Sequence, residues 1–218
     1  MLNPADALAG VEPWLLAGTA AMTFGAAFIR GLTGFGMAII LVPLLGLVVT
    51  PGEAVVLGIF LQVLIGPVGL KIIYADAERQ SAITIALFAV IATPVGIWLL
   101  KLTSPDVARL LIAAIAIGAF VLVLLPQRPG FKPGRKETVA TGIISGILTG
   151  FAAMPGPPVV PYYLRQQILP ATARASMMLI FFATAISGTL SSFAMGIASW
   201  RLAWLSLMLF FPMLLGNW

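Results

Sequence analysis

Long runs without a charged residue set the strongest limit on what this chain can fold into. Such runs cover residues 13–29, 31–52, 54–70, 138–164 and 175–200. A helix needs about 20 mostly apolar residues to cross the hydrocarbon core of a membrane. Charged residues make up 9% of the chain, far below the roughly 25% of a soluble domain. The sequence therefore predicts an all-α polytopic membrane protein.

Hydrophobicity and helix-breaking residues predict where the helices lie. We expect them at residues 13–30, 36–50, 54–74, 80–101, 106–126, 137–153, 156–169, 174–195 and 200–218. The second and seventh are short and contain Pro43 and Pro161, respectively. Lipid tolerates a broken backbone only where it is buried in protein or lines a wet cavity. These two helices could cross the membrane, or dip into it and return.

The basic residues favour crossing. If both short helices cross, Lys101, Arg109 and Arg201 lie on one side, and the other nine of the 12 lysines and arginines lie opposite. If both re-enter, the split is seven to five. Basic residues concentrate on the cytoplasmic side. We therefore predict a multi-pass protein of the plasma membrane, with its N-terminus outside and the loop at 127–136 in the cytoplasm.

Two stretches of the chain repeat each other. The sequence Thr-Gly-Phe at 33–35 returns at 149–151, 116 positions later, and Pro43 matches Pro161. Ala54 and Ala173 are 119 positions apart, as are Gly69 and Gly188. Five crossings precede the second copy, so it starts from the opposite face. We predict two inverted repeats of about five helices each: residues 1–126, a basic cytoplasmic linker at 127–136, and residues 137–218. The second repeat is expected to be incomplete, because the partner of helix 106–126 would lie beyond residue 218.

The first repeated motif, Gly-Leu-Thr-Gly-Phe-Gly at 31–36, predicts a break in a helix. Each glycine destabilises a helix by about 1 kcal/mol relative to alanine. A new helix can begin near Met37. Its unpaired N–H groups and the positive end of its dipole would suit an anion. Close packing of helices through small residues is the alternative explanation.

The second copy is more distorted, with three prolines among residues 155–158. Proline cannot donate a backbone hydrogen bond, so helix 137–153 must stop there. A new helix can begin near Pro157, with its first free N–H groups at Val159 and Val160. A purely structural kink is the alternative. Broken helices at matching places in two halves typically mark the binding site of a transporter near the membrane midplane.

Three polar side chains stand near these breaks. Arg30 could bind an anion through two hydrogen bonds or extend to lipid headgroups. Gln62 could bond a neighbouring helix or face a cavity, and Tyr162 could face the cavity or join an interfacial aromatic belt. The predicted substrate-binding residues are Arg30, Thr33, Gly34, Phe35, Gly36, Gln62, Thr149, Gly150, Met154, Pro155, Gly156, Pro157 and Tyr162.

Missing residue types exclude several functions. The chain has no cysteine and no histidine, and its seven acidic residues map to helix ends or loops. We therefore expect no catalysis, no cofactor, no metal site and no carboxylate proton relay in the membrane. A proton or a sodium ion remains possible as a coupling ion. The basic residues stand mostly singly at the ends of apolar segments, which indicates orientation in lipid rather than binding of nucleic acid.

The order of motifs resembles the sulfite exporter TauE/SafE family, also called the 4-toluene sulfonate uptake permease family. The resemblance rests on Gly-Phe-Gly at 34–36, Pro43, Glu-Ala at 53–54, Gly146 and Pro-Gly-Pro-Pro at 155–158, and it covers residues 14–218. It implies a plasma-membrane transporter of small sulfur-containing anions, such as sulfite and sulfonates. We expect a permease with alternating access around a midplane site. A passive anion channel is the alternative, and an intramembrane enzyme a weaker one.

Overall fold

All regular elements in the described residues are helices, as the sequence predicts. The computed structural model describes residues 13–68, 70–125, 130 and 133–217. Residues 1–12, 69, 126–129, 131–132 and 218 lie outside this range, and with them half of the predicted linker at 127–136. The helices are α2 (Pro13–Thr33), α3 (Met37–Leu45), α4 (Pro51–Ile65), α5 (Leu70–Asp76), α6 (Arg79–Leu102), α7 (Pro105–Leu124), α8 (Arg135–Ala152), α9 (Gly156–Leu164), α10 (Pro170–Ala194) and α11 (Trp200–Gly216).

Local chemistry determines where several of these helices begin. At α4, the Thr50 hydroxyl accepts a hydrogen bond from the Glu53 N–H, and the Glu53 carboxylate accepts one from the Thr50 N–H. This reciprocal pair satisfies two of the backbone donors that a helix start leaves unpaired. At α6, the Glu78 carboxylate caps the Ser81 N–H at 2.9 Å. The acidic residues Glu53 and Glu78 therefore serve as caps at helix ends.

The prediction of one continuous helix at 54–74 is wrong, because the structure divides this segment into α4 and α5 with a turn at 66–68. Pro67 cannot donate a backbone hydrogen bond. A Cβ at Gly66 would lie 2.6 Å from Cγ of Phe182 on α10, so the aromatic ring packs directly on the backbone there. The two short helices also end earlier than expected, at Leu45 and Leu164.

Four helices, α2, α6, α7 and α10, are long and apolar enough to span a membrane, judged by length and composition. Along α7, large apolar side chains point away from the protein, including Leu110, Ile117 and Phe120. Such a face suits contact with lipid. The structure and this exposed apolar surface agree with a polytopic membrane protein.

Helices from the two halves pack against each other. Helix α6 of the first half lies along α8 of the second, and α11 of the second half lies along α2 of the first. The contact between α6 and α8 is close because glycines face it. A Cβ at Gly142 would lie 2.7 Å from the Ile85 carbonyl oxygen, and a Cβ at Gly146 would lie 2.8 Å from Cβ of Ala92. Small residues let helix backbones approach in membranes.

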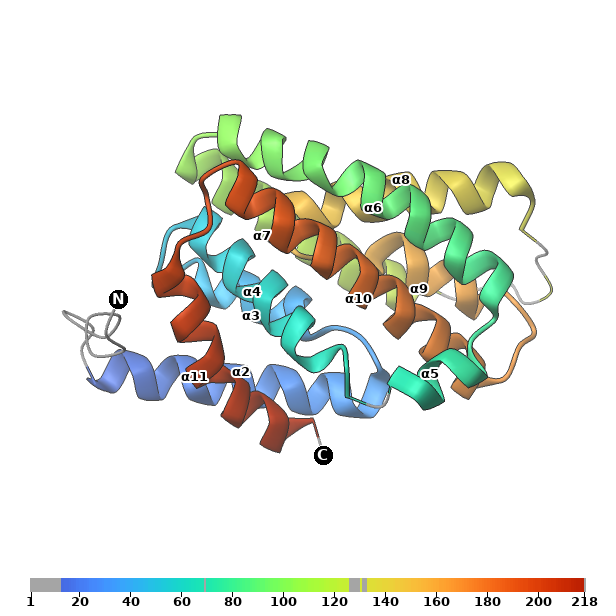
Figure 1. The fold of residues 1–218 in the computed structure, drawn as a ribbon, viewed down its shortest axis with the longest axis horizontal. Helices are drawn as coiled ribbons and strands as arrows, with labels where there is room; N and C mark the ends of the chain where they lie inside the picture. The colour runs from blue at the N-terminus through green and yellow to red at the C-terminus, as the bar shows by residue number, and fades with distance from the viewer. Residues whose placement is uncertain (1–12, 69, 126–129, 131–132, 218) are drawn as a thin grey trace.

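Two pairs of helices in the two halves start at the same spacing. Helices α3 and α9 each have nine residues and begin 119 positions apart, and α4 and α10 begin at prolines with the same spacing. The last residue of α2, Thr33, therefore corresponds to the last residue of α8, Ala152. The repeated Thr-Gly-Phe motif had instead paired Thr33 with Thr149. The difference of three residues is about one helical turn. Helices α2 and α8 run in opposite directions: α2 runs from left to right and α8 from right to left (Figure 1).

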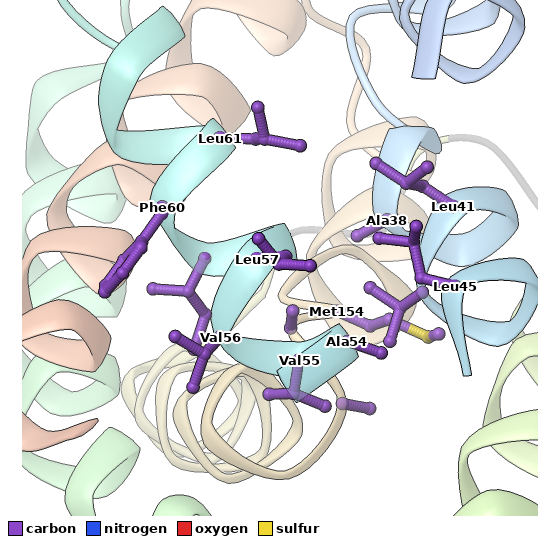
Figure 2. Close-up of a cluster of buried hydrophobic side chains, with 14 of the residues drawn as sticks. Ala38, Leu41, Leu45, Ala54, Val55, Val56, Leu57, Phe60, Leu61 and Met154 are labelled. Atoms are coloured by element: carbon purple, nitrogen blue, oxygen red, sulfur yellow. The ribbon is translucent and has the colours of Figure 1, made fainter. Parts of the chain in front are cut away.

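Each short helix returns the chain to the end of the molecule where the preceding long helix began. The start of α2, at Leu15 and Leu16, shares a pocket with the end of α3 at Leu45. The start of α8, at Arg135, shares another with Tyr162 of α9. Between α3 and α4 lies the main apolar core, in which Leu41, Leu57, Met154 and their neighbours gather (Figure 2).

Candidate functional site

The first helix break is built by two glycines with left-handed backbone conformation. Gly34 and Gly36 have φ angles of 82° and 93°, which few residues other than glycine adopt without strain. The Gly34 N–H donates to the Arg30 carbonyl at 2.7 Å and closes α2. Gly36 then caps α3. Helix geometry leaves the N–H groups of the first turn, from Met37 onwards, without partners inside the helix.

The second break uses different residues for a similar path. Ala153, with φ of 57°, closes α8 by donating its N–H to the Thr149 carbonyl at 2.8 Å. Pro155 caps α9, which begins at Gly156. The expectation that Val159 and Val160 supply the first free N–H groups is wrong. The helix starts at Gly156, so both valines follow its first three residues. Gly156 supplies the only N–H in its first turn, since two prolines follow it.

Residues of both breaks line one small cavity. The cavity lies between Phe35, Gly36 and the start of α3 on one side and Met154, Pro155 and Gly156 on the other, with Arg30 of α2, Gln62 of α4 and Phe181 of α10 completing its wall. Its volume is ≈ 20 Å³, enough for roughly one water molecule. The helix break of the first half therefore meets the helix break of the second half at this cavity.

The cavity walls come from equivalent positions of the two halves. With the spacing of 119 found for the short helices, Phe35 pairs with Met154, Gly36 with Pro155, Met37 with Gly156 and Gln62 with Phe181, and all eight line the cavity. Sequence reasoning missed Phe181. The spacing that links Ala54 to Ala173 would have found it, because Phe181 is the counterpart of Gln62.

Arg30 is the charged residue of the cavity wall. Its side chain is 7% exposed, and Nη1 donates to Oδ1 of Asn217 at 3.0 Å. Arg174 of α10 lies near it: Nη2 of Arg174 donates to the Gly31 carbonyl at 2.8 Å. Within the described part of the chain, the one ion pair joins Arg109 to Asp106. Among the described residues, the cavity wall therefore has a buried cation and no acidic side chain.

Gln62 contacts the cavity but also holds the second break in place. Its side-chain nitrogen donates to the carbonyl oxygens of Gly58 at 3.1 Å and Ala153 at 3.0 Å. Ala153 is the residue with left-handed conformation at the end of α8. The two alternatives for Gln62, a helix-to-helix bond and a cavity position, are therefore both realised.

Six of the predicted binding residues lie outside the cavity wall. At the first break, the exposed Thr33 bonds the backbone of Ile29 and Phe35, and Gly34 lies against Arg174, whose Cγ would be 2.5 Å from a Cβ at that position. These residues shape the break rather than face the cavity.

The other residues of this group belong to the second half. Thr149 is fully buried and donates to the Ser145 carbonyl, and Gly150 packs on the backbone of α6. Pro157 is buried next to the cavity without lining it. The Tyr162 hydroxyl lies 2.9 Å from Oγ1 of Thr138, toward the end of the molecule that holds the start of α8.

Comparisons with known proteins identify the family. A family model described as sulfite exporter TauE/SafE matches residues 19–218. The chain belongs to the sulfite exporter TauE/SafE family. It is similar to a protein of Cupriavidus necator named "Probable sulfite/organosulfonate exporter TauE", with 26% identity over 193 residues that cover 85% of this chain and 72% of the relative. No solved structure matches the chain.

Membership of the TauE/SafE family confirms the resemblance seen in the motifs. It agrees with the helical architecture and with the four helices of membrane-spanning length. The chain is therefore a membrane transport protein of an exporter family. In the described residues, no group of three histidine, cysteine, aspartate or glutamate side chains could hold a metal ion.

Proposed function

We propose that this protein is a secondary transporter that moves small sulfur-containing anions, such as sulfonates and sulfite, across the plasma membrane. The observation that carries the proposal is the cavity between the two helix breaks, with buried Arg30 in its wall. The name of the Cupriavidus necator relative supports this class of substrate. The two halves would exchange positions around the cavity in alternating access.

The chemistry of the cavity suits an anion. A guanidinium group can donate two parallel hydrogen bonds to a sulfonate or sulfite. The first-turn residues of α3, Met37, Ala38 and Ile39, line the same cavity. The N–H groups of a first turn have no partner inside the helix, and they carry the positive end of the helix dipole. Donors of this kind, without a carboxylate among the described residues of the wall, favour anions over cations.

The closed state favours a carrier over a passive channel. A volume of ≈ 20 Å³ holds about one water molecule, which is less than a sulfonate group needs. The wall must therefore move before a substrate enters. Buried side chains, such as Leu41 of α3 and Val159 of α9, fill the space beyond the cavity. A channel would instead need a continuous water-filled path.

We further propose that residues 1–126 and 137–218 form inverted repeats, with the linker at 127–136 in the cytoplasm and the N-terminus outside. The opposite directions of α2 and α8 support this arrangement (Figure 1), as does the nine-to-three distribution of basic residues.

The membrane potential bears on the direction of transport. Moving one negative charge out of an inside-negative cell gains about 2.3 kcal/mol per 100 mV. Export of a monovalent anion therefore needs no coupling ion, whereas uptake would need a proton or a sodium ion. Export agrees with the name of the family.

Flux measurements on the purified protein in liposomes test this function. Radiolabelled sulfite, toluene sulfonate and sulfoacetate are loaded inside, and efflux is followed with and without unlabelled anion outside. We expect saturable efflux that external substrate accelerates, because a carrier returns faster when loaded. Efflux that external substrate leaves unchanged would indicate a channel. No flux of any of these anions would refute the proposed function.

A further inference from the structure

Two larger pockets flank the central cavity. The first, which we call the α3 pocket, has a volume of ≈ 470 Å³ and lies at the end of α3, between the starts of α2 and α4 and helix α11. The second, the α9 pocket, has a volume of ≈ 1040 Å³ and lies at the end of α9, between the starts of α6 and α8. Both are large enough for a small molecule.

The two pockets are made of equivalent residues. Leu15, Leu16 and Thr19 line the α3 pocket, and Gly134, Arg135 and Thr138, each 119 positions later, line the α9 pocket. The same spacing relates residues 47–49 in the first pocket to residues 166–168 in the second. In both pockets, therefore, one wall is the start of a long helix (α2 or α8) and another is the segment that follows a short helix (α3 or α9).

A third wall of each pocket, from α11 in the α3 pocket and from α6 in the α9 pocket, also consists of corresponding residues, here at a spacing of 121. Leu202, Leu205 and Met208 of α11 correspond to Ser81, Thr84 and Leu87 of α6. The caps of the two helices agree with this spacing, because Ser199 caps the N–H of Leu202 as Glu78 caps that of Ser81. In total, eleven of the sixteen residues that line each pocket have a counterpart in the other.

The pockets lie at opposite ends of the molecule. Helix α6 begins at the α9 pocket and ends at Leu102, and α7, which starts at Pro105, contributes Arg109 to the α3 pocket. The 24 residues of α6 extend about 36 Å at 1.5 Å per residue. This length exceeds the hydrocarbon core of a membrane, about 30 Å.

Buried side chains separate each pocket from the central cavity. Helix α3 runs from the cavity at Met37 to the α3 pocket at Leu45, and Leu41 and Val42 between them are fully buried. Figure 2 shows Leu41 packed in the core with Leu57 and Met154. This apolar layer closes the path toward the α3 pocket.

On the other side, the buried side chains of Val159 and Val160 lie between the cavity end and the pocket end of α9. Helix α9 runs from the cavity at Gly156 to its pocket at Tyr162. The hydroxyl of Tyr162 contacts Thr138 of α8, and that of Tyr163 contacts Ser81 of α6, each at 2.9 Å. These pairs join α9 to the two helices that form the pocket.

We propose that the α3 and α9 pockets are one structural element used twice, and that they are the outer and inner mouths of the path through the central cavity. This inference rests on the proposed transport function. A small anion enters one mouth, reaches the cavity when the layer next to it opens, and leaves through the other. Charged residues of both signs line the two mouths: Arg109, Arg201 and Glu53 in the α3 pocket, and Arg135 and Glu78 in the α9 pocket.

Single cysteines test whether the two mouths open to opposite faces. The chain contains no cysteine, so each new one is the only thiol. Leu205→Cys in the α3 pocket and its counterpart Thr84→Cys in the α9 pocket form a matched pair. Met208→Cys and Leu87→Cys form a second pair. Ile117→Cys, on the apolar face of α7, is the control for a position in lipid.

A charged, membrane-impermeant methanethiosulfonate is applied to oriented membrane vesicles, either right-side-out or inverted. We expect Leu205→Cys and Met208→Cys to react only from outside, Thr84→Cys and Leu87→Cys only from inside, and Ile117→Cys from neither. Reaction of both members of a pair from the same face, or of no pocket cysteine from either face, overturns the proposal. Flux is measured separately. Opposite-sided labelling without flux would refute the transport function alone, and same-sided labelling with intact flux would refute the two mouths alone.

Discussion

Two glycines of the second half separate packing from binding. Gly150 lies on the face of α8 that packs against α6, whereas Gly156 starts α9 and lines the central cavity. Both were predicted from the sequence to bind substrate. Replacement of each by alanine adds one methyl group in two very different surroundings. We expect Gly150→Ala to lower stability and Gly156→Ala to lower affinity.

The structure gives the size of each effect. A Cβ at Gly150 would clash with the Thr93 carbonyl oxygen and lie 2.6 Å from the Ile97 nitrogen, so the helices would have to separate by at least about 0.8 Å to reach an ordinary contact of 3.4 Å. Overpacking of this kind costs roughly 1–3 kcal/mol, which is partly offset because alanine favours a helix over glycine by about 1 kcal/mol. We expect a net loss of about 1–2 kcal/mol.

Gly156→Ala has room for its methyl group, because the nearest atoms of Val160 and Phe181 would lie 3.7 and 3.8 Å away. Stability should therefore not fall. The methyl group would take up much of a cavity of ≈ 20 Å³ and keep an anion from the backbone. We expect at least tenfold weaker binding.

Unfolding in detergent, followed by tryptophan fluorescence with and without toluene sulfonate, measures both effects. At 100 times its dissociation constant a ligand stabilises by about 2.7 kcal/mol, and tenfold weaker binding reduces this to about 1.4 kcal/mol. Gly156→Ala should show the reduced shift, and Gly150→Ala the full shift on a less stable protein. If Gly150→Ala kept its stability and lost the ligand shift, the packing argument would be refuted and Gly150 would belong to the binding site.

Two further predictions concern polar groups. Arg30→Gln should weaken anion binding about ten- to a hundredfold, because a charge-assisted hydrogen bond contributes about 1.5–3 kcal/mol. Calorimetric titration measures this, with Arg79→Gln, far from the cavity, as control; unchanged affinity would make Arg30 a topology charge. Thr138→Val removes the partner of the Tyr162 hydroxyl, so a Met154→Cys thiol in the cavity wall should be labelled faster from inside. An unchanged rate would show that this hydrogen bond does not close the path from the inner mouth to the cavity.

Much of the fold follows from the sequence because lipid imposes simple rules. An uncharged apolar run long enough to cross a membrane has few alternatives to a helix. The breaks near Gly34 and Pro155 follow from residues that weaken or end helices. The sequence could not show that Gly66 and Pro67 divide another helix, because the break is completed by the Phe182 ring of α10, a contact between distant parts of the chain.

The roles of individual site residues were harder to predict. Small residues at a helix break and small residues at a helix crossing look alike in a sequence. Gly150 and Gly156 are therefore both plausible cavity residues until the neighbouring helices are placed. Gln62 was found because a lone amide in an apolar helix stands out. Its counterpart Phe181 has no such signal, since an aromatic residue in a membrane helix is ordinary.

Ala153, which has a left-handed backbone conformation at the end of α8, shows why aligning identical residues paired the wrong positions of the two halves. Gly34 takes this conformation freely, and its structural counterpart is Ala153, not Gly150. A non-glycine residue there costs on the order of 1 kcal/mol or more. The Ala153 carbonyl accepts a hydrogen bond from the Gln62 side chain, which helps to offset this cost. Both breaks share the backbone hydrogen bond that closes the preceding helix, from Gly34 to Arg30 and from Ala153 to Thr149. The first break adds the freedom of glycine, and the second adds the bond from Gln62. The two breaks therefore share a backbone conformation although the residues differ, and only the structure reveals that Gly34 and Ala153 correspond.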